Sequence, residues 1–172
     1  MSRVGLVTYS TKPRGGVVHL LALADALSKR SFPVEIMALG DPQIGFSRPV
    51  SVRCSFVAPP IPAPELETRV FDAIEALAAY LGGRIGDLPP VLHVQDCIAA
   101  RAAVRIRDAG AEVRVVRTVH HVDDFTTPAL IECQRRSILD PDRLLVVSPT
   151  WQQRLAVEFG VDVEGNHGAG GA

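Results

Sequence analysis

Histidines and carboxylates gather in one short stretch of this 172-residue chain, Thr118-Val119-His120-His121-Val122-Asp123-Asp124-Phe125. Both side-chain types can bind a metal ion or exchange protons with a substrate. Adjacent residues on an extended backbone point to opposite faces, so His120 and His121 are poorly placed to share one ion. We therefore expect no metal here, and we expect a single histidine, His120 or His121, to reach into a cleft and donate to a substrate hydroxyl.

A second candidate is Gly15-Gly16, which follows a polar loop and opens a predicted helix. Free N–H groups at a helix start favour an anion such as a phosphate, and glycines let the ligand approach the backbone. The alternative is a tight turn that needs positive φ. The pair matches neither G-x-G-x-x-G nor G-K-[ST], which weakens an NAD-binding interpretation, although Asp41 lies about where a ribose-binding acid would stand. Arg14, directly before the pair, is expected to contact substrate.

Two further polar residues stand where a predicted strand gives way to a helix. Asp96, in the stretch His93-Val94-Gln95-Asp96, can cap the following helix or accept hydrogen bonds from sugar hydroxyls. Ser148, directly before Pro149, can contact a ligand or cap the last helix. His93 falls inside a predicted strand, so we expect it to be buried and hydrogen-bonded within the protein.

These candidates all lie near the ends of predicted strands. Short apolar runs predict strands at 4–8, 34–39, 51–57, 91–94, 113–119 and 143–147, and helical periodicity predicts helices at 15–30, 65–81, 96–109, 127–139 and 149–159. The alternation predicts an α/β fold, a Rossmann-like doubly wound and mostly parallel sheet with helices on both faces. Because ligands bind at the carboxyl ends of strands in such sheets, the candidate residues should meet at one edge.

The composition excludes several classes of protein. Lys and Arg (18) nearly balance Asp and Glu (19), for a net charge of -1, so a general affinity for nucleic acid is not expected. The three cysteines are too widely spaced for a disulfide framework or a zinc site, so we expect reduced thiols in a cytoplasmic protein. No apolar run could span a bilayer, which leaves peripheral contact with the inner face of the membrane open.

In order along the chain, the motifs resemble the N-terminal half of the retaining GT-B glycosyltransferases of family 4, also called group 1. The resemblance covers residues 3–163 and is carried by four segments: Gly15 to Leu27, His93 to Asp96, Arg117 to His120, and Val146 to Thr150. It implies one of two Rossmann-like domains that face each other across a cleft. The N-terminal domain of the family mainly binds the acceptor, and the C-terminal domain binds the nucleotide-sugar and carries a Glu-x7-Glu motif.

The resemblance also implies roles for individual residues. Gly15 and Gly16 would donate N–H groups to the donor diphosphate and stabilise charge on the leaving phosphate. His120 matches the histidine near the reacting sugar and is the catalytic candidate. Asp96 matches a polar substrate-side position, and His121 replaces an acid often found after the strand histidine. The nucleotide-sugar is a co-substrate, so no further cofactor and no metal is implied.

The resemblance sets an expectation for the domains. We expect residues 1–163 to form the glycosyltransferase domain and 164–172 a flexible Gly-rich tail. No donor domain follows, so we expect a truncated gene, a shifted frame or a cut fragment of a hexosyltransferase, inactive without the missing domain in cis or in trans. The alternatives are a stand-alone acceptor-binding or partner-docking module and, less favoured, a Rossmann-type NAD-binding domain.

Overall fold

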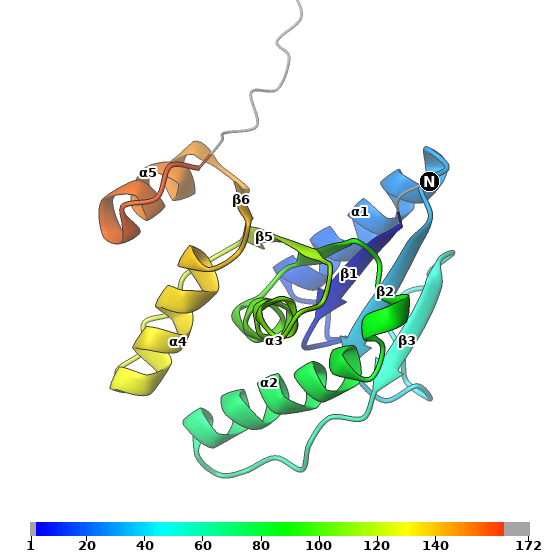
Figure 1. Cartoon of the computed structure of the whole chain (residues 1–172), viewed down its shortest axis with the longest axis horizontal. Helices are drawn as coiled ribbons and strands as arrows, with labels where there is room; N and C mark the ends of the chain where they lie inside the picture. Colours follow the sequence, from blue (N-terminus) through cyan, green and yellow to red (C-terminus); the bar gives the residue numbers. More distant parts are fainter. Residues whose placement is uncertain (1–2, 164–172) are drawn as a thin grey trace, which may run out of the picture.

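The computed structural model describes residues 3–163, and the expected tail at 164–172 lies outside the described residues. Strands and helices alternate along this part of the chain (Figure 1). In order they are β1 (Val4–Thr8), α1 (Gly15–Lys29), β2 (Val34–Leu39), β3 (Arg53–Val57), α2 (Leu66–Gly82), a 3-10 turn (Ile85–Asp87), β4 (Val91–Val94), α3 (Cys97–Asp108), β5 (Arg114–Val119), α4 (Pro128–Leu139), β6 (Arg143–Val146) and α5 (Pro149–Phe159).

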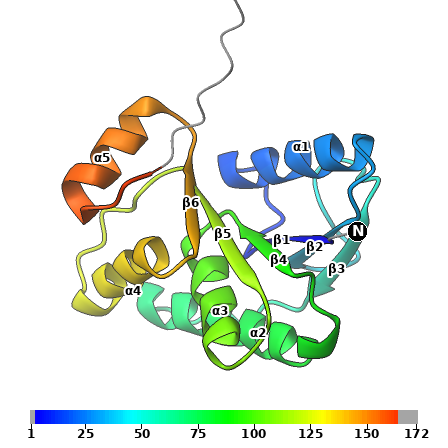
Figure 2. The ribbon, with the colours of Figure 1, turned by 45° about the horizontal axis from the view of Figure 1, so that its top comes forward.

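The strands form one sheet in the order β3-β2-β1-β4-β5-β6, and every neighbouring pair is parallel. From β1 the chain builds outward to β3, and from β4 it builds outward in the opposite direction to β6. Helix α1 covers one face of the sheet, and α2 and α3 cover the other (Figure 2). This is the doubly wound α/β fold that the sequence predicts, and its order reverses between β1 and β4.

Burial on both faces explains why the strands are continuously apolar. Successive residues of a strand point to opposite faces. Leu6 of β1 packs into a cluster with Leu20 and Leu21 of α1, whereas its neighbour Val7 packs into the cluster formed with α2 and α3. Both Leu6 and Val7 are fully buried. A polar residue on either face of this strand would therefore lose its contact with water.

Small side chains shape the layer on the α2 side of the sheet. Four alanines of α3 are completely buried in the cluster that α3 shares with α2 and the sheet: Ala99, Ala100, Ala102 and Ala103. Alanine adds little bulk and favours the helix. The helix therefore lies close to its neighbours, and its first turn is held firmly at the sheet edge.

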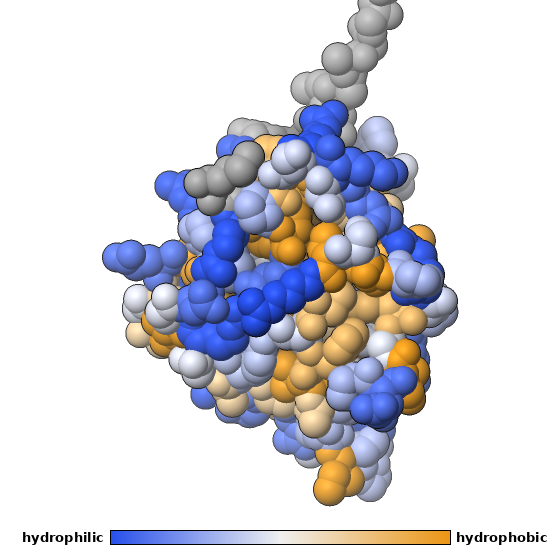
Figure 3. Space-filling view, turned by 90° about the vertical axis from the view of Figure 1, so that its right-hand side faces the viewer, coloured by the Kyte–Doolittle hydropathy of each residue, from blue (hydrophilic) through white to orange (hydrophobic). Residues whose placement is uncertain are grey.

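The third strand is shorter than predicted, since it begins at Arg53 rather than at residue 51. Its only partner is β2, where Arg53 pairs with Glu35 near the beginning of that strand. The ladder between the two strands begins at this pair, one residue after the start of β2 at Val34. The 3-10 turn at Ile85–Asp87 is not predicted by the sequence patterns. Figure 3 shows the side of the molecule that carries β3, where apolar side chains lie between hydrophilic ones.

Candidate functional site

A cavity of about 510 Å³ lies at the carboxyl ends of β1, β4 and β5, where the strand order reverses. Its walls also include the starts of α1 and α2 and the segment after β5. Five residues that the sequence predicts for the site line it: Arg14, Gly16, Asp96, His120 and His121. Gly15 and Ser148 do not line this cavity. The structure thus brings most of the predicted residues together.

Helix α1 begins at the cavity without a side-chain cap, because Arg14 at the N-cap position makes no capping hydrogen bond. The first intrahelical bond runs from Val18 N to Arg14 O, at 2.9 Å. The N–H groups of residues 15–17 therefore precede the hydrogen-bonded ladder, as at any helix start. Helices α2 and α4 also begin without a side-chain cap, whereas Asp96 caps α3 and Ser148 caps α5. The uncapped start leaves α1 able to receive an anion.

Neither glycine of the pair serves a tight turn. Positive φ among the described glycines occurs at Gly45, Gly110 and Gly160, and Gly15 and Gly16 have ordinary helical backbone. The tight-turn alternative is therefore wrong. A glycine inside a helix costs about 0.5–1 kcal/mol relative to alanine. Backbone conformation therefore does not explain the glycine pair, and the absence of two side chains at the helix start is its remaining effect.

Gly16 faces His120 across the cavity wall. A Cβ atom placed on Gly16 would lie 3.5 Å from His120 Cδ2 and 3.6 Å from Gln95 O, which is ordinary van der Waals contact. A Cβ on Gly15 would meet nothing within 4 Å. Gly16 is thus the member of the pair that stands at the site, next to the catalytic candidate.

Gln95 joins two histidines and is a site residue that sequence reasoning did not single out. Its Oε1 accepts from His19 Nδ1 at 3.0 Å and from His120 Nε2 at 2.8 Å. The rings of His19 and His120 meet edge to face, with centroids 4.9 Å apart. Gln95 follows β4 directly, beside Asp96, and this place at a strand end is the signal that could have identified it.

The bond to Gln95 sets the role of His120. With Oε1 of Gln95 facing the ring, His120 donates from Nε2 and its Nδ1 is left as an acceptor, while the buried Gln95 Nε2 has no hydrogen-bond partner. In this tautomer a substrate hydroxyl would donate to Nδ1, whereas the donor role expected from the sequence belongs to the other tautomer. Burial, together with the nearby His19, His121 and Arg117, lowers the pKa of His120 to about 4. The imidazole is therefore neutral at pH 7.

Both carboxylate oxygens of Asp96 accept hydrogen bonds from groups within the protein. Oδ1 accepts from Ala99 N at 2.7 Å and so caps α3, while Oδ2 accepts from Thr8 Oγ1 at 3.0 Å and Tyr9 N at 3.1 Å. Burial raises the pKa of this carboxyl, and these hydrogen bonds oppose the rise. The capping role is thus present in the structure, and it ties the loop after β1 to the start of α3.

The remaining predicted residues lie toward the rim or outside the cavity. The side chain of His121 is 69% exposed, and its Nε2 lies 3.3 Å from a carboxylate oxygen of Asp123. Arg14 donates from Nη1 to the hydroxyl of Tyr9 at 2.8 Å. Ser148 accepts from Trp151 N at 3.3 Å at the start of α5. His120 is therefore the histidine that stands beside the helix start, and His121 faces solvent.

Two buried groups complete the environment beneath the cavity. His93 is buried in β4, where its Nε2 lies 2.8 Å from Thr118 Oγ1, and burial lowers its pKa to about 4. Arg117 is 3% exposed and donates from Nη1 to the hydroxyl of Ser137. Its Nε has no hydrogen-bond partner, and burial lowers its pKa. Sequence reasoning noticed Arg117 only as part of a motif.

Within residues 3–163, no group of three or more His, Cys, Asp or Glu side chains is arranged to hold a metal ion. In the same part of the chain, no helix combines the length and apolarity that crossing a membrane requires.

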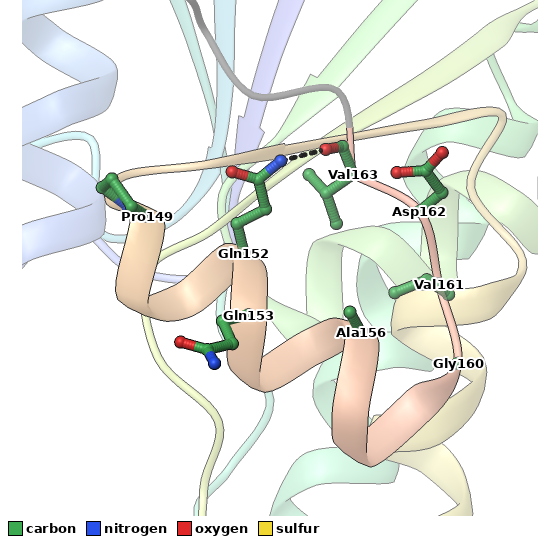
Figure 4. A pocket seen from close by; sticks show the side chains of 8 residues that line it. All are labelled: Pro149, Gln152, Gln153, Ala156, Gly160, Val161, Asp162 and Val163. Atoms are coloured by element: carbon green, nitrogen blue, oxygen red, sulfur yellow. Dashed lines mark hydrogen bonds between the residues drawn. The ribbon is translucent and has the colours of Figure 1, made fainter.

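A second hollow of about 460 Å³ lies between α5 and the segment that follows it (Figure 4). Gln152 of α5 donates from Nε2 to the carbonyl of Val163 at 2.7 Å and closes one side of the hollow. None of the predicted site residues lines it. The hollow reflects how the chain folds back along α5 rather than a gathering of reactive groups.

A family model described as Glycosyltransferase Family 4 matches residues 13–164, which is most of the chain and includes the cavity-lining residues from Arg14 onward. The chain belongs to glycosyltransferase family 4. The resemblance seen in the sequence is thereby confirmed. No curated protein matches the chain.

Solved structures share the fold of this family 4 domain. A sucrose-phosphate synthase from Thermosynechococcus elongatus has a TM-score of 0.68 at 15% identity, covering 95% of this chain and 47% of that one. The lipopolysaccharide outer core galactosyltransferase WaaB, in its apo form, has a TM-score of 0.68 at 14% identity. The match covers 94% of this chain and 43% of that one. The catalytic domain of starch synthase IV from Arabidopsis thaliana, bound to ADP and acarbose, has a TM-score of 0.67 at 15% identity. The match covers 90% of this chain and 46% of that one.

The chain thus spans about half the length of these three glycosyltransferase structures. At such low identity they show the fold, and the fold is that of one GT-B half-domain. The expected α/β architecture is confirmed at this level.

Proposed function

We propose that this family 4 domain is the acceptor-side half of a retaining glycosyltransferase, which moves a sugar from a nucleotide-sugar to an acceptor hydroxyl. The observation that carries the proposal is the cavity at the β1/β4 switch point, where the uncapped glycine start of α1 faces His120. Transfer of a sugar from a diphosphate to a hydroxyl needs one group that stabilises the anionic leaving phosphate and another that forms a hydrogen bond with the hydroxyl. The helix start and His120 would supply these two groups in one cavity.

The residues divide the work by their chemistry. The N–H of Gly16 and the positive end of the α1 dipole would stabilise the charge that develops on the leaving diphosphate. The neutral imidazole of His120 offers Nδ1 to a sugar or acceptor hydroxyl, while Gln95 holds the ring through Nε2. Arg14 and His121 stand at the rim, where they can contact either substrate. None of these steps calls for a metal ion.

Transfer also needs a second wall that binds the donor, because donor and acceptor must be held together to react. We propose that a donor-binding domain faces this cavity, in cis or in trans, and that the domain does not transfer sugar alone. The three free thiols, Cys54, Cys97 and Cys133, support a reducing, cytoplasmic location for the reaction.

The first experiment measures binding to this chain. Titration with UDP, ADP and GDP, followed by NMR or calorimetry, should show weak binding of one nucleoside diphosphate that perturbs Gly16 and His120. Tight binding of NAD, with no response to the diphosphates, would contradict the glycosyltransferase assignment.

The second experiment tests His120 in the enzyme assembled with a donor domain. We expect His120→Ala to lower kcat by at least about 100-fold, the range for losing a positioned acid or base. Circular dichroism should show an unchanged fold. The matched control is His121→Ala, which removes an exposed imidazole and should keep most of the activity. Unchanged turnover in His120→Ala would remove His120 from the catalytic assignment.

A stand-alone acceptor-binding module is the second candidate, and one observation favours it. The walls of the 510 Å³ cavity come entirely from this chain, so a ligand could bind without a partner. The module predicts acceptor binding by the isolated chain and no transfer when donor domain and nucleotide-sugar are added. The transferase predicts transfer under the same conditions.

A further inference from the structure

Two of the three cysteines meet beside the cavity, although they are widely separated in sequence. Cys97 is the first residue of α3 and lines the cavity, and Cys133 lies buried on α4. Their Sγ atoms are 3.8 Å apart, the distance of a thiol hydrogen bond. Cys54 stands on β3, where its Sγ contacts Val52 O. The sequence alone gave no reason to pair any of the three.

The surroundings of Cys97 favour its thiolate form. Helix starts and nearby cations stabilise a thiolate, and Cys97 opens α3 close to the buried Arg117. The hydrogen bond from Cys133 lowers the pKa of Cys97 to about 7, with Arg117 and Ser137 acting in the same direction against the effect of burial. The same contact raises the pKa of Cys133. The pair therefore consists of a thiol with a lowered pKa that the cavity reaches and a thiol with a raised pKa behind it.

We propose that Cys97 and Cys133 are a redox-active dithiol, in which Cys97 attacks a small disulfide in the cavity and Cys133 resolves the product into an intramolecular disulfide. Glutathione disulfide represents the class of oxidant. The inference is independent of the proposed function, because the chemistry concerns only these thiols and the oxidant.

The reaction balances in two exchange steps. The Cys97 thiolate attacks one sulfur of glutathione disulfide, forms a mixed disulfide and releases one glutathione thiolate. Cys133 then loses its proton to solvent, its sulfur attacks Cys97 Sγ, and the second glutathione thiolate leaves. Counted from the dithiol, the protein loses two protons and two electrons, and the oxidant takes them up to become two molecules of glutathione.

Formation of the Cys97–Cys133 disulfide would change the cavity wall, because α4 carries Cys133 and contacts the loop after β5. A disulfide brings the two sulfurs to about 2.05 Å, closer than the present 3.8 Å, so α3 and α4 must adjust. Gln134, next to Cys133, holds the loop after β5: Asp123 N donates to its Oε1 at 2.7 Å, and its Nε2 donates to Asp123 O at 2.8 Å. Asp123 lines the cavity. Oxidation should therefore change that loop.

The test uses the full reduced chain in buffers of increasing glutathione disulfide, with free thiols then blocked and the protein digested with trypsin. Cleavage after arginine places Cys97 in peptide 85–101, Cys133 in 118–135 and Cys54 in 54–69. We expect mass spectrometry to find 85–101 linked to 118–135, with 54–69 blocked as a free thiol. At pH 7, Cys97 should also react with iodoacetamide on the order of ten times faster than Cys54.

Conservative variants separate the two roles. Cys133→Ser should stop at a mixed disulfide of Cys97 with glutathione, Cys97→Ser should form neither product, and Cys54→Ser should behave as the parent chain. A lasting glutathione adduct on Cys97 in the parent chain, or a link that includes Cys54, would overturn the proposal. Hydrogen exchange at Asp123 N should change on oxidation in the parent and in Cys54→Ser. Unchanged exchange there would overturn the coupling to the cavity wall.

Discussion

The absent side chain at Gly16 and the shared amide of Gln95 illustrate what residue types alone can and cannot reveal. The glycine pair and His120 were visible in the sequence, because a glycine at a helix start and a histidine at a strand end are local patterns. Gln95 and the Cys97–Cys133 contact were not, because each depends on side chains that the sheet brings together from distant segments. The orientation of the His120 ring likewise depends on Gln95, a partner that no local pattern identifies.

Replacing Gly16 should raise the stability of the protein and weaken the binding of a nucleoside diphosphate. A Cβ fits at ordinary contact distance, so Gly16→Ala should raise the free energy of unfolding by about 0.5 kcal/mol, as removal of a helical glycine does. The added methyl group narrows the approach to the helix start, so the Kd of a nucleoside diphosphate should rise about 10-fold, or ~1.4 kcal/mol. Gly15→Ala is the matched control, with similar stability and unchanged affinity. Urea unfolding measures the stability of each variant, and calorimetry measures the Kd. Equal losses of affinity in Gly16→Ala and Gly15→Ala would contradict the assignment of Gly16 to the site.

Replacing Gln95 should change the titration of His120. In Gln95→Glu a carboxylate would accept from the same imidazole nitrogens, and an opposite charge favours the protonated ring. The pKa of His120 should therefore rise from about 4 by about 1–3 units. NMR titration of the imidazole Cε1–H measures it. A pKa that stays near 4 would show that Gln95 does not hold the ring in solution.

At the scale of the element, the sequence located most strands and helices well. The predicted bounds are confirmed for four elements, β1, β2, β4 and α5. The three strands are clear apolar runs, and α5 is a clear helical period. The start of β3 differed because its length is set by β2, a partner that the local sequence does not reveal. The bounds of α3 differ by one residue at each end, since Asp96 and Ala109 act as caps.

The close approach of α3 to its neighbours predicts a sensitivity to bulk. Ala102 is fully buried, so Ala102→Leu should lower the free energy of unfolding by about 1–3 kcal/mol through overpacking. Ala26→Leu on the exposed side of α1 is the control and should stay within about 0.5 kcal/mol of the parent. Denaturant unfolding compares the two. A tolerated Ala102→Leu would mean that α3 has more room than its burial indicates.

At the scale of the whole molecule, two histidines with lowered pKa values link stability to pH. The pKa of His93 lies at about 4 in the folded protein because of burial, against an ordinary value of 6.5. Between these values the unfolded chain binds more protons than the folded one, so stability rises with pH through this window and is complete above it. His120 contributes in the same direction, and less, because it is partly exposed.

The expected loss on acidification from pH 7 to pH 4 is on the order of 2–3 kcal/mol for His93. His93→Gln keeps a hydrogen-bonding partner for Thr118 and cannot be protonated, so its stability should depend less on pH across the window. Urea midpoints for parent and variant, measured at several pH values from 4 to 7, provide the comparison. Identical pH dependence in the two proteins would rule out His93 as the source.

The pairing of β1 with β4 also decides how this chain can fold. Val4 pairs with Val91, so the central contact of the sheet closes a loop that contains two helices and two other strands. Closing a long loop costs entropy before the contact repays it, and such pairing slows folding. During synthesis β1, β2 and β3 emerge first, and β1 then presents an unpaired edge until β4 arrives. That interval is when a growing chain is most exposed to wrong pairing, and the cavity exists only after it has passed.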